Sequence, residues 1–596
     1  MGLVERVRRN VVFLVSAVRV LNRIKFNSPE SPVTTADYVE TWAAKRPDHV
    51  AIYFDDRRVT YKEWDEAAYK YARWALDRGV KRGDVVALMM ENRPEFLIAW
   101  TGMAKIGAVT ALINTRLRSQ PLAHCIELAH PKHLILGGEC IANYASAAEF
   151  LRKPLSVWVT GGSLEGARNL DVELSAQSGA RLPEGIRRGL TAAATCFYIY
   201  TSGTTGMPKA ARLTHYRVGN IMNGFAAATG ARASDRIYIP MPLYHSAGGV
   251  AGVGTCLTVG GAVILKRQFS AGAFWKDCVR YQATIFQYIG ELCRYLINAP
   301  PVPEERAHKI RVCVGNGLRV DIWETFRHRF MIPRILEFYG ATEGNVLLFN
   351  FDGKPGAVGR VPRYLRRRYL FALVEFDVER QEPVRDPDGF CREVPTGEVG
   401  ECLGAIYDRP RSRFEGYSNV DETERKILRD VFEKDDAWFR TGDLMRKDKH
   451  GYFYFVDRVG DTFRWKGENV STSEVEHVIS MFDGIKEANV YGVRIPNMEG
   501  RAGMASLVVE EGIDLKRLKT HIADALPEYA RPLFLRLRQE IDTTSTLKHR
   551  KLDLVEHGFD PAVVVEPLYF ANPEVGEYVP LDEDLFHQIR SGRFRF

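Results

Sequence analysis

A predicted buried strand followed by a polar, glycine-rich loop is the feature that most restricts the fold of this chain. The aromatic and β-branched residues at 196–200 are typical of such a strand. The loop after it offers backbone N–H groups and hydroxyls, and its glycines let the backbone approach a ligand closely. Consecutive N–H groups of this kind bind anions, and Lys209 adds a positive charge. The segment therefore predicts a phosphate-binding loop, formed by Thr201, Ser202, Gly203, Thr204, Thr205 and Gly206.

The loop does not match the Walker pattern of P-loop nucleotide-binding proteins. That pattern places a lysine directly after its second glycine, whereas Met207 and Pro208 separate Gly206 from Lys209. Pro208 also lacks a backbone N–H and favours an extended Met207. The sequence therefore excludes the P-loop class and predicts a different phosphate-binding loop.

Short apolar runs alternate with helical patterns along the chain. Continuous apolar strands separated by helices indicate an α/β fold with buried sheets. The clearest runs are 85–90, 262–265, 284–289, 310–314 and 335–339. The last two lead into glycine-containing loops, the position at which α/β sheets bind ligands.

The pattern changes near residue 455. Strand-like segments at 488–495 and 503–511 precede a helical pattern at 514–526, which Pro527 ends. This is the pattern of a small α+β unit after a much larger α/β one. We place the boundary between the two at Asp457.

Length and composition narrow the class of protein. A chain of 596 residues is too long for one ordinary core, so two or more domains are expected. The net charge of +7 is mild, and no nucleic-acid-binding motif is present, so we expect no nucleic-acid partner. The nine cysteines form no CxxC pair and the fourteen histidines no HExxH motif. We therefore expect reduced thiols in a cytosolic enzyme and no transition metal held by the protein.

Residues 1–27 form a basic segment with apolar residues at helical spacing. Its uncharged run, 11–18, would extend only about 12 Å as a helix, whereas a bilayer core is about 30 Å thick. Two interpretations remain open: a helix lying on a membrane surface, or one packed on the protein itself. A second basic cluster at 360–370 contains five arginines. It could bind an anionic membrane surface or be an ordinary solvated loop.

Four motifs, in this order, resemble those of the adenylate-forming superfamily, which includes acyl-CoA synthetases. They are the phosphate motif TSGTTGMPK at 201–209, YGATEG at 339–344, TGD at 441–443 and the hinge segment DRVGDTFRWKGENVS at 457–471. Within the superfamily, GNGLRVDIWETF at 315–326 and YVPLDEDLFHQI at 578–589 look most like the very-long-chain acyl-CoA synthetases, also called fatty acid transport proteins.

The resemblance implies an architecture and a reaction. After the basic segment at 1–27, it implies a large AMP-binding domain at 28–456 and a small mobile α+β domain at 457–596 that rotates about Asp457. The reaction would join a long or very long fatty acid to ATP, giving acyl-adenylate and pyrophosphate, and then to coenzyme A, releasing AMP. ATP, Mg²⁺ and coenzyme A are the implied cofactors.

The resemblance also assigns roles to residues of the large domain. The 201–206 loop and Lys209 would hold the β- and γ-phosphates, Thr342 would contact the α-phosphate, and Glu343 would bind Mg²⁺. His245 would lie near the reacting carboxylate. The adenine site would consist of Gly315, Asn316, Tyr339, Gly340 and Ala341.

Further roles fall near and beyond residue 440. Asp443 and Arg458 would bind the ribose, and the loop of Gly467 and Glu468 would reach the coenzyme A tunnel. The catalytic lysine aligns with Lys548, although Ser545 and Leu547 stand where this branch has glycine and phenylalanine. Lys551 is the competing candidate, and a solvated basic turn is the alternative interpretation of Lys551.

Other functions stay open at this point. The chain could pass its acyl-adenylate to a carrier protein, or support fatty acid uptake through coupled activation. We expect a cytoplasmic enzyme, with a peripheral contact on the inner face of the membrane as an open alternative. A homo-oligomer is compatible with the sequence, and no pattern in it reveals the preferred acyl chain length.

Overall fold

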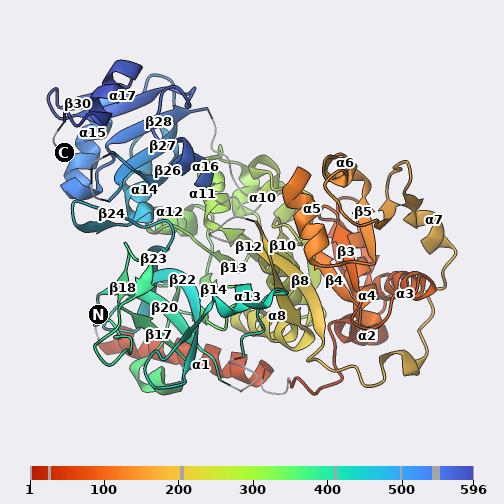
Figure 1. Ribbon diagram of the computed structural model, residues 1–596. Helices are drawn as coiled ribbons and strands as arrows, with labels where there is room; N and C mark the ends of the chain where they lie inside the picture. Colours follow the sequence, from red (N-terminus) through yellow and green to blue (C-terminus); the bar gives the residue numbers. More distant parts are fainter. Residues whose placement is uncertain are drawn as a thin grey trace. The chain divides into compact units, whose positions relative to one another are not determined.

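The computed structural model describes residues 3–24, 28–201, 207–368, 370–407, 413–496, 498, 500–539 and 551–594 (Figure 1). The chain divides into two compact units. The large unit consists of Met1–Leu370 with Ala405–Ile427, and the small unit of Phe371–Gly404 with Leu428–Phe596. This division differs from the predicted one at Asp457. A division into compact units does not identify the residue about which a domain rotates, so the hinge at Asp457 remains a prediction.

Among the described residues, one sheet of the large unit has seven strands in the order β7-β6-β5-β3-β4-β8-β9. All neighbours are parallel except β8 and β9, which form an antiparallel pair at one side. The strands are β3 (Val85–Met89), β4 (Val109–Leu112), β5 (His133–Gly137), β6 (Ser156–Thr160), β7 (Arg168–Asn169), β8 (Thr195–Thr201) and β9 (Lys209–Thr214). This sheet carries both ends of the predicted phosphate loop.

The second sheet of the large unit has eight described strands in the order β15-β14-β13-β12-β10-β11-β1-β2. Only the outermost pairs are antiparallel. The strands are β1 (Val50–Phe54), β2 (Arg57–Thr60), β10 (Arg236–Ile239), β11 (Ala262–Leu265), β12 (Ile285–Ile289), β13 (Val312–Asn316), β14 (Ile335–Gly340) and β15 (Leu347–Asn350). The predicted α/β class with mostly parallel sheets is thus confirmed.

Most helices of the large unit connect these strands, as a parallel sheet requires. They are α2 (Ala36–Lys45), α3 (Tyr61–Asp77), α4 (Pro94–Lys105), α5 (Ser119–Leu128), α6 (Ile141–Ala148), α7 (Leu170–Ser175), α8 (His215–Thr229), α9 (Val253–Leu257), α10 (Ala271–Arg280), α11 (Gly290–Asn298), α12 (Val320–Arg329) and α13 (Val420–Glu424). Their starts follow local rules. Thr60 and Glu63 form a reciprocal capping box at α3, which satisfies two N–H groups at the helix start.

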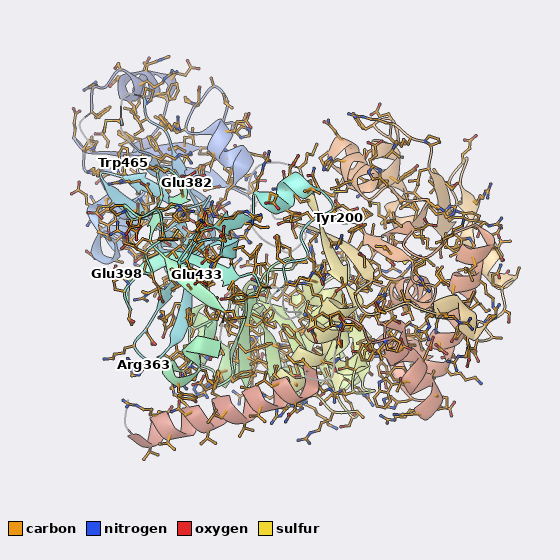
Figure 2. All side chains as sticks on the ribbon, turned by 60° about the horizontal axis from the view of Figure 1, so that its bottom comes forward. Tyr200, Arg363, Glu382, Glu398, Glu433 and Trp465 are labelled. Atoms are coloured by element: carbon orange, nitrogen blue, oxygen red, sulfur yellow. The ribbon has the colours of Figure 1, made fainter. Side chains whose placement is uncertain are left out.

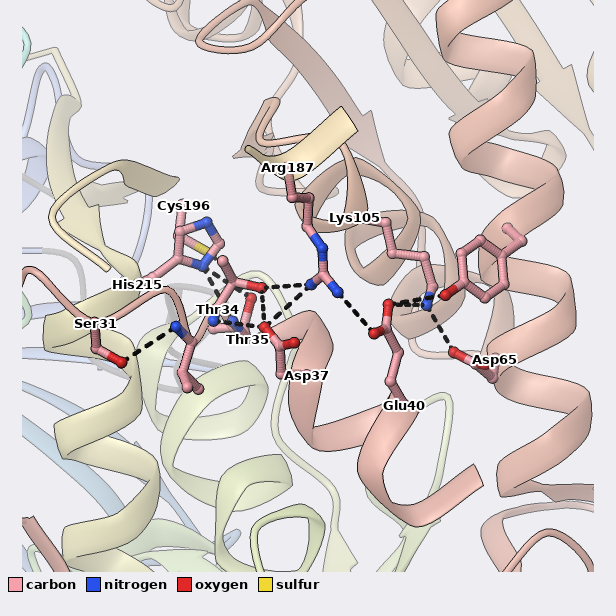
Figure 3. Close-up of polar contacts among 12 residues, drawn as sticks. Ser31, Thr34, Thr35, Asp37, Glu40, Asp65, Lys105, Arg187, Cys196 and His215 are labelled. Carbon is pink, nitrogen blue, oxygen red and sulfur yellow. Dashed lines mark hydrogen bonds and ion pairs between the residues drawn. The ribbon is translucent and has the colours of Figure 1, made fainter. Parts of the chain in front are cut away.

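A buried polar network ties α2 to the rest of the large unit (Figure 3). The Lys105 ammonium lies 2.7 Å from carboxylate oxygens of both Glu40 and Asp65. Arg187 pairs with Glu40 at 2.7 Å and with Asp37 at 3.1 Å. Burial opposes ionisation of Glu40, but Lys105 and Arg187 outweigh it and lower the pKa of this carboxyl. The two carboxylates of α2 are therefore paired with cations of the large unit.

The helix α1 (Leu3–Ile24) packs on α8 through only part of its surface. Phe13 and Ser16 are buried, and the Phe13 ring lies 5.7 Å from that of Phe351. Arg23 donates hydrogen bonds to Asn223 and to the carbonyl of Thr258. The outward face is nevertheless apolar, with exposed Val4, Val7, Val11, Leu14, Val15, Val18 and Leu21. In the described part of the chain, no helix combines the length and apolar character needed to cross a bilayer.

The small unit contains two larger sheets. The first has the order β23-β22-β20-β17, with β21 (Ile427–Arg429) beside β22. Its strands are β17 (Phe371–Val374), β20 (Val399–Ala405), β22 (Ala437–Lys447) and β23 (Tyr452–Arg458), and β18 (Phe376–Asp377) pairs with β19 (Glu382–Pro383). The second has the order β26-β27-β28-β29-β30: Ile485–Val493, Ala502–Val509, Phe534–Arg538, Leu568–Asn572 and Glu577–Pro580.

The helices α14 (Thr472–Ser480), α15 (Leu515–Ala525), α16 (Leu552–His557) and α17 (Glu583–Arg590) accompany this five-stranded sheet. Val475, Ile522 and Phe586, from three of these helices, belong to one apolar core with residues of β26–β29. The hairpin of β24 (Phe463–Trp465) and β25 (Glu468–Val470) adds Trp465 to the same core (Figure 2). The predicted α+β character of this part is confirmed.

Candidate functional site

The two ends of the phosphate loop lie side by side. Thr201 ends β8, Lys209 begins β9, and the two are direct partners across the antiparallel pair. Ser202, Gly203, Thr204, Thr205 and Gly206 lie outside the described residues. The Lys209 ammonium forms an ion pair with Glu422 of α13. The hydrogen bond from Lys209, together with its positive charge, lowers the pKa of the Glu422 carboxyl.

The turn that carries Thr342 and Glu343 is held by Arg217 of α8. The Arg217 guanidinium donates hydrogen bonds to the carbonyl of Thr342 at 2.7 and 3.1 Å, and to that of Gly344. Burial lowers the pKa of Arg217. The Thr342 hydroxyl lies 2.7 Å from that of Ser246. Arg217 thus fixes the backbone from which the predicted α-phosphate and magnesium residues project.

Tyr417 joins this turn to the phosphate loop. Its hydroxyl donates a hydrogen bond of 2.7 Å to Glu343 Oε1, and Thr201 lies near enough to the same phenol to act on its pKa, in the lowering direction. Burial is the main cause that raises the pKa of Tyr417, and the Glu343 carboxylate adds to it. Residues from three distant segments therefore meet at one side chain.

The predicted adenine residues lie on adjacent strands. Gly315 and Asn316 end β13, and Tyr339 and Gly340 end its parallel neighbour β14. Ala341 follows directly. A Cβ at Gly315 would come within 2.2 Å of the Tyr288 carbonyl, so this strand approach requires glycine.

Glu337 of β14 fixes the loop after β13. Its carboxylate accepts hydrogen bonds from the Tyr288 hydroxyl at 2.6 Å and from the N–H groups of Leu318 and Gly317. Burial raises its pKa to about 7, although these hydrogen bonds oppose the shift. This buried acid therefore holds the loop that begins at the predicted adenine site.

His245 directly precedes a π-helical turn, η3 (Ser246–Gly252). Its ring centroid lies 4.6 Å from that of Tyr244, and its carbonyl accepts from the N–H of Gly249. Ser246, the next residue, contacts Thr342, so His245 lies on the same stretch of backbone as a group that reaches the site. Its catalytic role stays a prediction.

In the small unit, the predicted ribose residues are neighbours. Asp443 of β22 and Arg458 of β23 are direct cross-strand partners, with Arg458 Nε 3.8 Å from Asp443 Oδ1. Thr441, in the same motif, donates a hydrogen bond to the carbonyl of Cys402. The carboxylate and guanidinium can therefore act on one ligand.

The predicted hinge residue, Asp457, is almost fully buried next to the start of α14. Its carboxylate accepts hydrogen bonds from the N–H of Thr472 at 2.6 Å and from the Thr472 hydroxyl. Burial raises the pKa of Asp457, and the nearby Lys551 charge opposes the shift. Asp457 thus fastens the end of β23 to the first turn of α14.

Gly467 and Glu468 lie at a tight hairpin between β24 and β25. Lys466 and Gly467 both have positive φ, 52° and 82°, and Trp465 pairs with Glu468. Two such residues between antiparallel strands form a type I′ turn, for which glycine is favoured at the second position. The Glu468 side chain is exposed, which suits a loop that contacts a ligand.

Lys548, together with Ser545 and Leu547, lies outside the described residues. Lys551 is described, and its interpretation as a solvated turn is wrong. Its Nζ donates to the Thr472 hydroxyl at 2.8 Å and lies 3.2 Å from Glu476 and 3.6 Å from Asp461. Burial opposes its positive charge, but the three nearby carboxylates outweigh burial and raise the pKa of Lys551. The ammonium is held within the small unit.

The donor groups suit magnesium better than a transition metal. Across the described residues, no three His, Cys, Asp or Glu side chains gather closely enough to hold a metal ion. Glu343 is a single half-buried carboxylate, and it directly follows Thr342, whose hydroxyl lies 2.7 Å from that of Ser246. Mg²⁺ commonly binds through one or two carboxylates plus phosphate oxygens, so this donor set fits it. All nine cysteines are free and buried.

Sequence reasoning missed Tyr417, Arg217, Glu337 and the contacts of Lys551. One signal was available for Glu337, because it is a charged residue inside an otherwise apolar strand, ILEFYG. For Tyr417 and Arg217 there was none, since each acts on residues more than seventy positions away in the chain.

Comparisons with known proteins agree with this architecture. Residues 39–402 match the family described as AMP-binding enzyme, and residues 474–548 match the AMP-binding enzyme C-terminal domain. The chain is 42% identical to mouse long-chain fatty acid transport protein 6 over 94% of its length and 91% of that protein. It is 40% identical to rat long-chain fatty acid transport protein 2, covering 98% and 94% of the two chains.

Among solved structures, an anthranilate CoA ligase, AuaEII, in complex with anthranoyl-AMP has the same fold. The TM-score is 0.74 at 21% identity, over 88% of this chain and 97% of that one. The fold is therefore that of the adenylate-forming enzymes, with a separate C-terminal domain. The chain belongs to the family of AMP-binding enzymes, in the branch of the long-chain fatty acid transport proteins.

Proposed function

We propose that this protein joins a long or very long chain fatty acid to coenzyme A, using ATP and Mg²⁺ and passing through an acyl-adenylate. The observation that carries the proposal is the assembly of Thr201, Lys209 and Glu343 around Tyr417. Two groups suited to phosphate and one suited to Mg²⁺ thus occupy one region. The names of the relatives, long-chain fatty acid transport proteins, supply the substrate class.

In the first step, the fatty carboxylate attacks the α-phosphorus of ATP and pyrophosphate leaves. Such displacement depends mainly on positioning and on charge neutralisation. Lys209 and the loop N–H groups bind the outer phosphates, and Thr342 contacts the α-phosphate. Mg²⁺, held by Glu343 and phosphate oxygens, would neutralise further charge. Lys548 offsets the charge of the transition state, His245 lies near the carboxylate, and Asp443 with Arg458 holds the ribose.

In the second step, the thiol of coenzyme A attacks the acyl-adenylate carbonyl and AMP leaves. We propose that the domain that follows Asp457 rotates between the steps, withdrawing Lys548 and bringing Gly467 and Glu468 to the coenzyme. Asp457→Pro should block this exchange: adenylate still forms, but thioester formation collapses in a single-turnover assay. Proline also removes the carboxylate that accepts the Thr472 N–H. Asp457→Asn is therefore the control, because it removes the charge without restricting the backbone. If both half-reactions survive in the proline variant, the hinge lies elsewhere.

The decisive assay follows pyrophosphate and AMP release with ATP, Mg²⁺ and a series of fatty acids of increasing length. We expect pyrophosphate release with acids of sixteen carbons or more, and AMP release that requires coenzyme A. AMP release that requires an acyl carrier protein instead would favour the carrier-loading alternative. Absence of acyl-adenylate from a protein that binds ATP would overturn the proposal.

A lysine substitution separates the two candidates for the catalytic lysine. Lys548→Ala should lose adenylation but still convert supplied acyl-AMP to thioester. Because the Lys551 ammonium is bound by two carboxylates and Thr472, we assign the catalytic role to Lys548. Full adenylation by Lys548→Ala would transfer that role to Lys551.

We also propose a peripheral contact between α1 and the cytoplasmic membrane surface. The exposed apolar face of α1 is accompanied by exposed Arg6 and Arg19, a combination that suits an anionic interface. Arg8 is exposed but pairs with Glu5, and Arg23 is bonded to Asn223 and Thr258. Arg360 of the second basic cluster does not contribute, because it is buried and donates to Asn10. Arg363 and Tyr364 are exposed (Figure 2 labels Arg363).

Vesicle co-sedimentation tests this contact. Val11→Asp combined with Leu14→Asp should lower binding to phosphatidylserine-containing vesicles by at least about tenfold, since two apolar side chains no longer enter the interface. Val172→Asp, on an exposed position of α7, is the control. Unchanged binding of the double variant would mean that the apolar face of α1 does not meet the membrane.

A further inference from the structure

Residues 415–418 lie alongside β9, the strand that begins with Lys209. The N–H of Arg212 donates to the carbonyl of Gly416 at 3.1 Å, and the N–H of Ser418 donates to the carbonyl of Ala210 at 2.9 Å. The Glu415 carboxylate accepts from the hydroxyl and the N–H of Thr214. This segment is therefore held in register with the strand that leaves the phosphate loop.

The register places the Tyr417 side chain at the centre of the predicted nucleotide groups. Tyr417 is buried and bridges to Ala211 through the backbone. Its hydroxyl donates to Glu343 at 2.7 Å and interacts with Thr201. The Lys209 ammonium lies 5.9 Å from the centre of its ring, at the limit of a cation–π contact.

These contacts have a direction. An ionised carboxylate accepts hydrogen bonds only, so the phenol O–H restricts the orientations that Glu343 can take. The second Glu343 oxygen has no part in the bond to Tyr417. A single carboxylate that meets a hard cation together with phosphate oxygens benefits from being held in one orientation before the cation arrives.

We propose that Tyr417 is a positioning residue that orients the Glu343 carboxylate for Mg²⁺-ATP and couples it to the phosphate loop. The inference rests on the proposed function, which makes Glu343 the magnesium residue. The inference assigns a role to Tyr417 that requires no direct contact with the substrate or the metal. Tyr417 acts through Glu343 and Thr201.

The test compares binding of ATP with and without Mg²⁺, by calorimetry, in the wild type and in Tyr417→Phe. Phenylalanine keeps the ring and removes the hydroxyl. Because hydrogen bonds to charged groups are the stronger kind, we expect the affinity for Mg²⁺-ATP to fall about tenfold. Affinity for metal-free ATP should stay within about twofold. The Mg²⁺ concentration for half-maximal adenylation should rise correspondingly.

Tyr200→Phe is the matched control. Tyr200 is also buried and donates one hydrogen bond, of 2.6 Å, but to the carbonyl of Cys125 rather than to a site residue (Figure 2). Its variant should keep the Mg²⁺ dependence of the wild type. A Glu343→Gln background provides a second control, since Tyr417→Phe should have no further effect on Mg²⁺ dependence there.

Three outcomes are informative. A selective loss of Mg²⁺-ATP affinity in Tyr417→Phe supports the inference. Equal losses with and without Mg²⁺, or no loss, would overturn it and leave the proposed ligase function intact. Failure of the wild type to bind ATP under either condition would overturn the proposed function itself.

Discussion

Two buried lysines show how similar chemistry serves different ends in the two units. Lys105, at the end of α4, lies between Glu40 and Asp65, with its ammonium 3.6 Å from the ring centre of Tyr69. Lys551, just before α16, lies between Glu476 and Asp461 and donates to Thr472. Both ammonium groups are removed from solvent and paired with two carboxylates.

The two clusters differ in the structural elements that carry the partners of each lysine. The partners of Lys105 project from α2 and α3, which are regular helices packed around it. The partners of Lys551 include Thr472, whose N–H and hydroxyl also hold Asp457. One ion-pair cluster joins helices within a core, whereas the other joins a chain segment to the predicted hinge. Both buried charges are thus strongly coupled to their neighbours, and the neighbours of Lys551 include a residue that also bonds to the predicted hinge residue.

Lys105→Met is the substitution with the largest expected effect. It leaves the largely buried carboxylates of Glu40 and Asp65 without their common cation, although Glu40 keeps Arg187. Breaking a buried pair typically costs about 3–5 kcal/mol. The free energy of unfolding, measured with urea, should fall by that amount. Lys62→Met, which removes the exposed pair with Glu66, should change it by less than about 1 kcal/mol. Similar losses of unfolding free energy in the two variants would show that the Lys105 cluster stabilises the protein no more than an exposed ion pair does.

Lys551→Met should have a smaller effect of a different kind. Its carboxylate partners Glu476 and Asp461 are partly exposed, so water can replace part of the lost interaction. We expect a loss of about 1–3 kcal/mol in the stability of the small unit. The rate of exchange between the two half-reactions should change, because the anchor of Asp457 is loosened. A variant with wild-type stability and wild-type exchange would show that Lys551 is not coupled to the hinge.

His215 should make the large unit sensitive to acid. Its Nδ1 lies 3.2 Å from the N–H of Thr35, and burial lowers its pKa to about 3 (Figure 3). A base with a lowered folded-state pKa contributes full stability above its unfolded pKa, near 6.5, and loses it as the pH falls from there toward 3.

His215 contributes a slope of about 1.4 kcal/mol per pH unit within that window, and Glu337, whose pKa is raised to about 7, contributes with the opposite sign. Unfolding by urea at pH 7.0, 6.0 and 5.0 measures it. His215→Gln should flatten the slope, because the glutamine amide can take the Thr35 hydrogen bond without titrating. An unchanged slope in this variant would assign the acid sensitivity to other groups.

Elements with continuous apolar sequence were predictable, and those set by partners were not. The run 262–265 coincides with β11. All residues of this buried parallel strand are apolar, so the limits of the apolar run are also the limits of the strand. The run 310–314 is displaced, since β13 extends to Asn316 through pairing with β12. Gly315 permits that extension because it has no side chain. The apolar run 310–314 ends before Gly315 and therefore does not predict the extension.

The site divides in the same way. Lys209, Thr342, Glu343 and Asp443 could be proposed because each lies within a short motif that resembles those of the adenylate-forming superfamily. Tyr417 and Lys551 required the fold, because their partners come from segments far away in the chain. Local sequence therefore proposes candidate ligand-binding groups, whereas the groups that contact them from distant segments become visible only in the tertiary structure.

The pairing of residues 416–418 with β9 has a further consequence for solubility. A strand at the end of a sheet normally presents unpaired N–H and C=O groups, which can recruit a strand from another molecule and start aggregation. Here two of those groups, the Arg212 N–H and the Ala210 carbonyl, are already bonded within the chain. The segment that carries Tyr417 thereby also shields this margin of the protein from self-association.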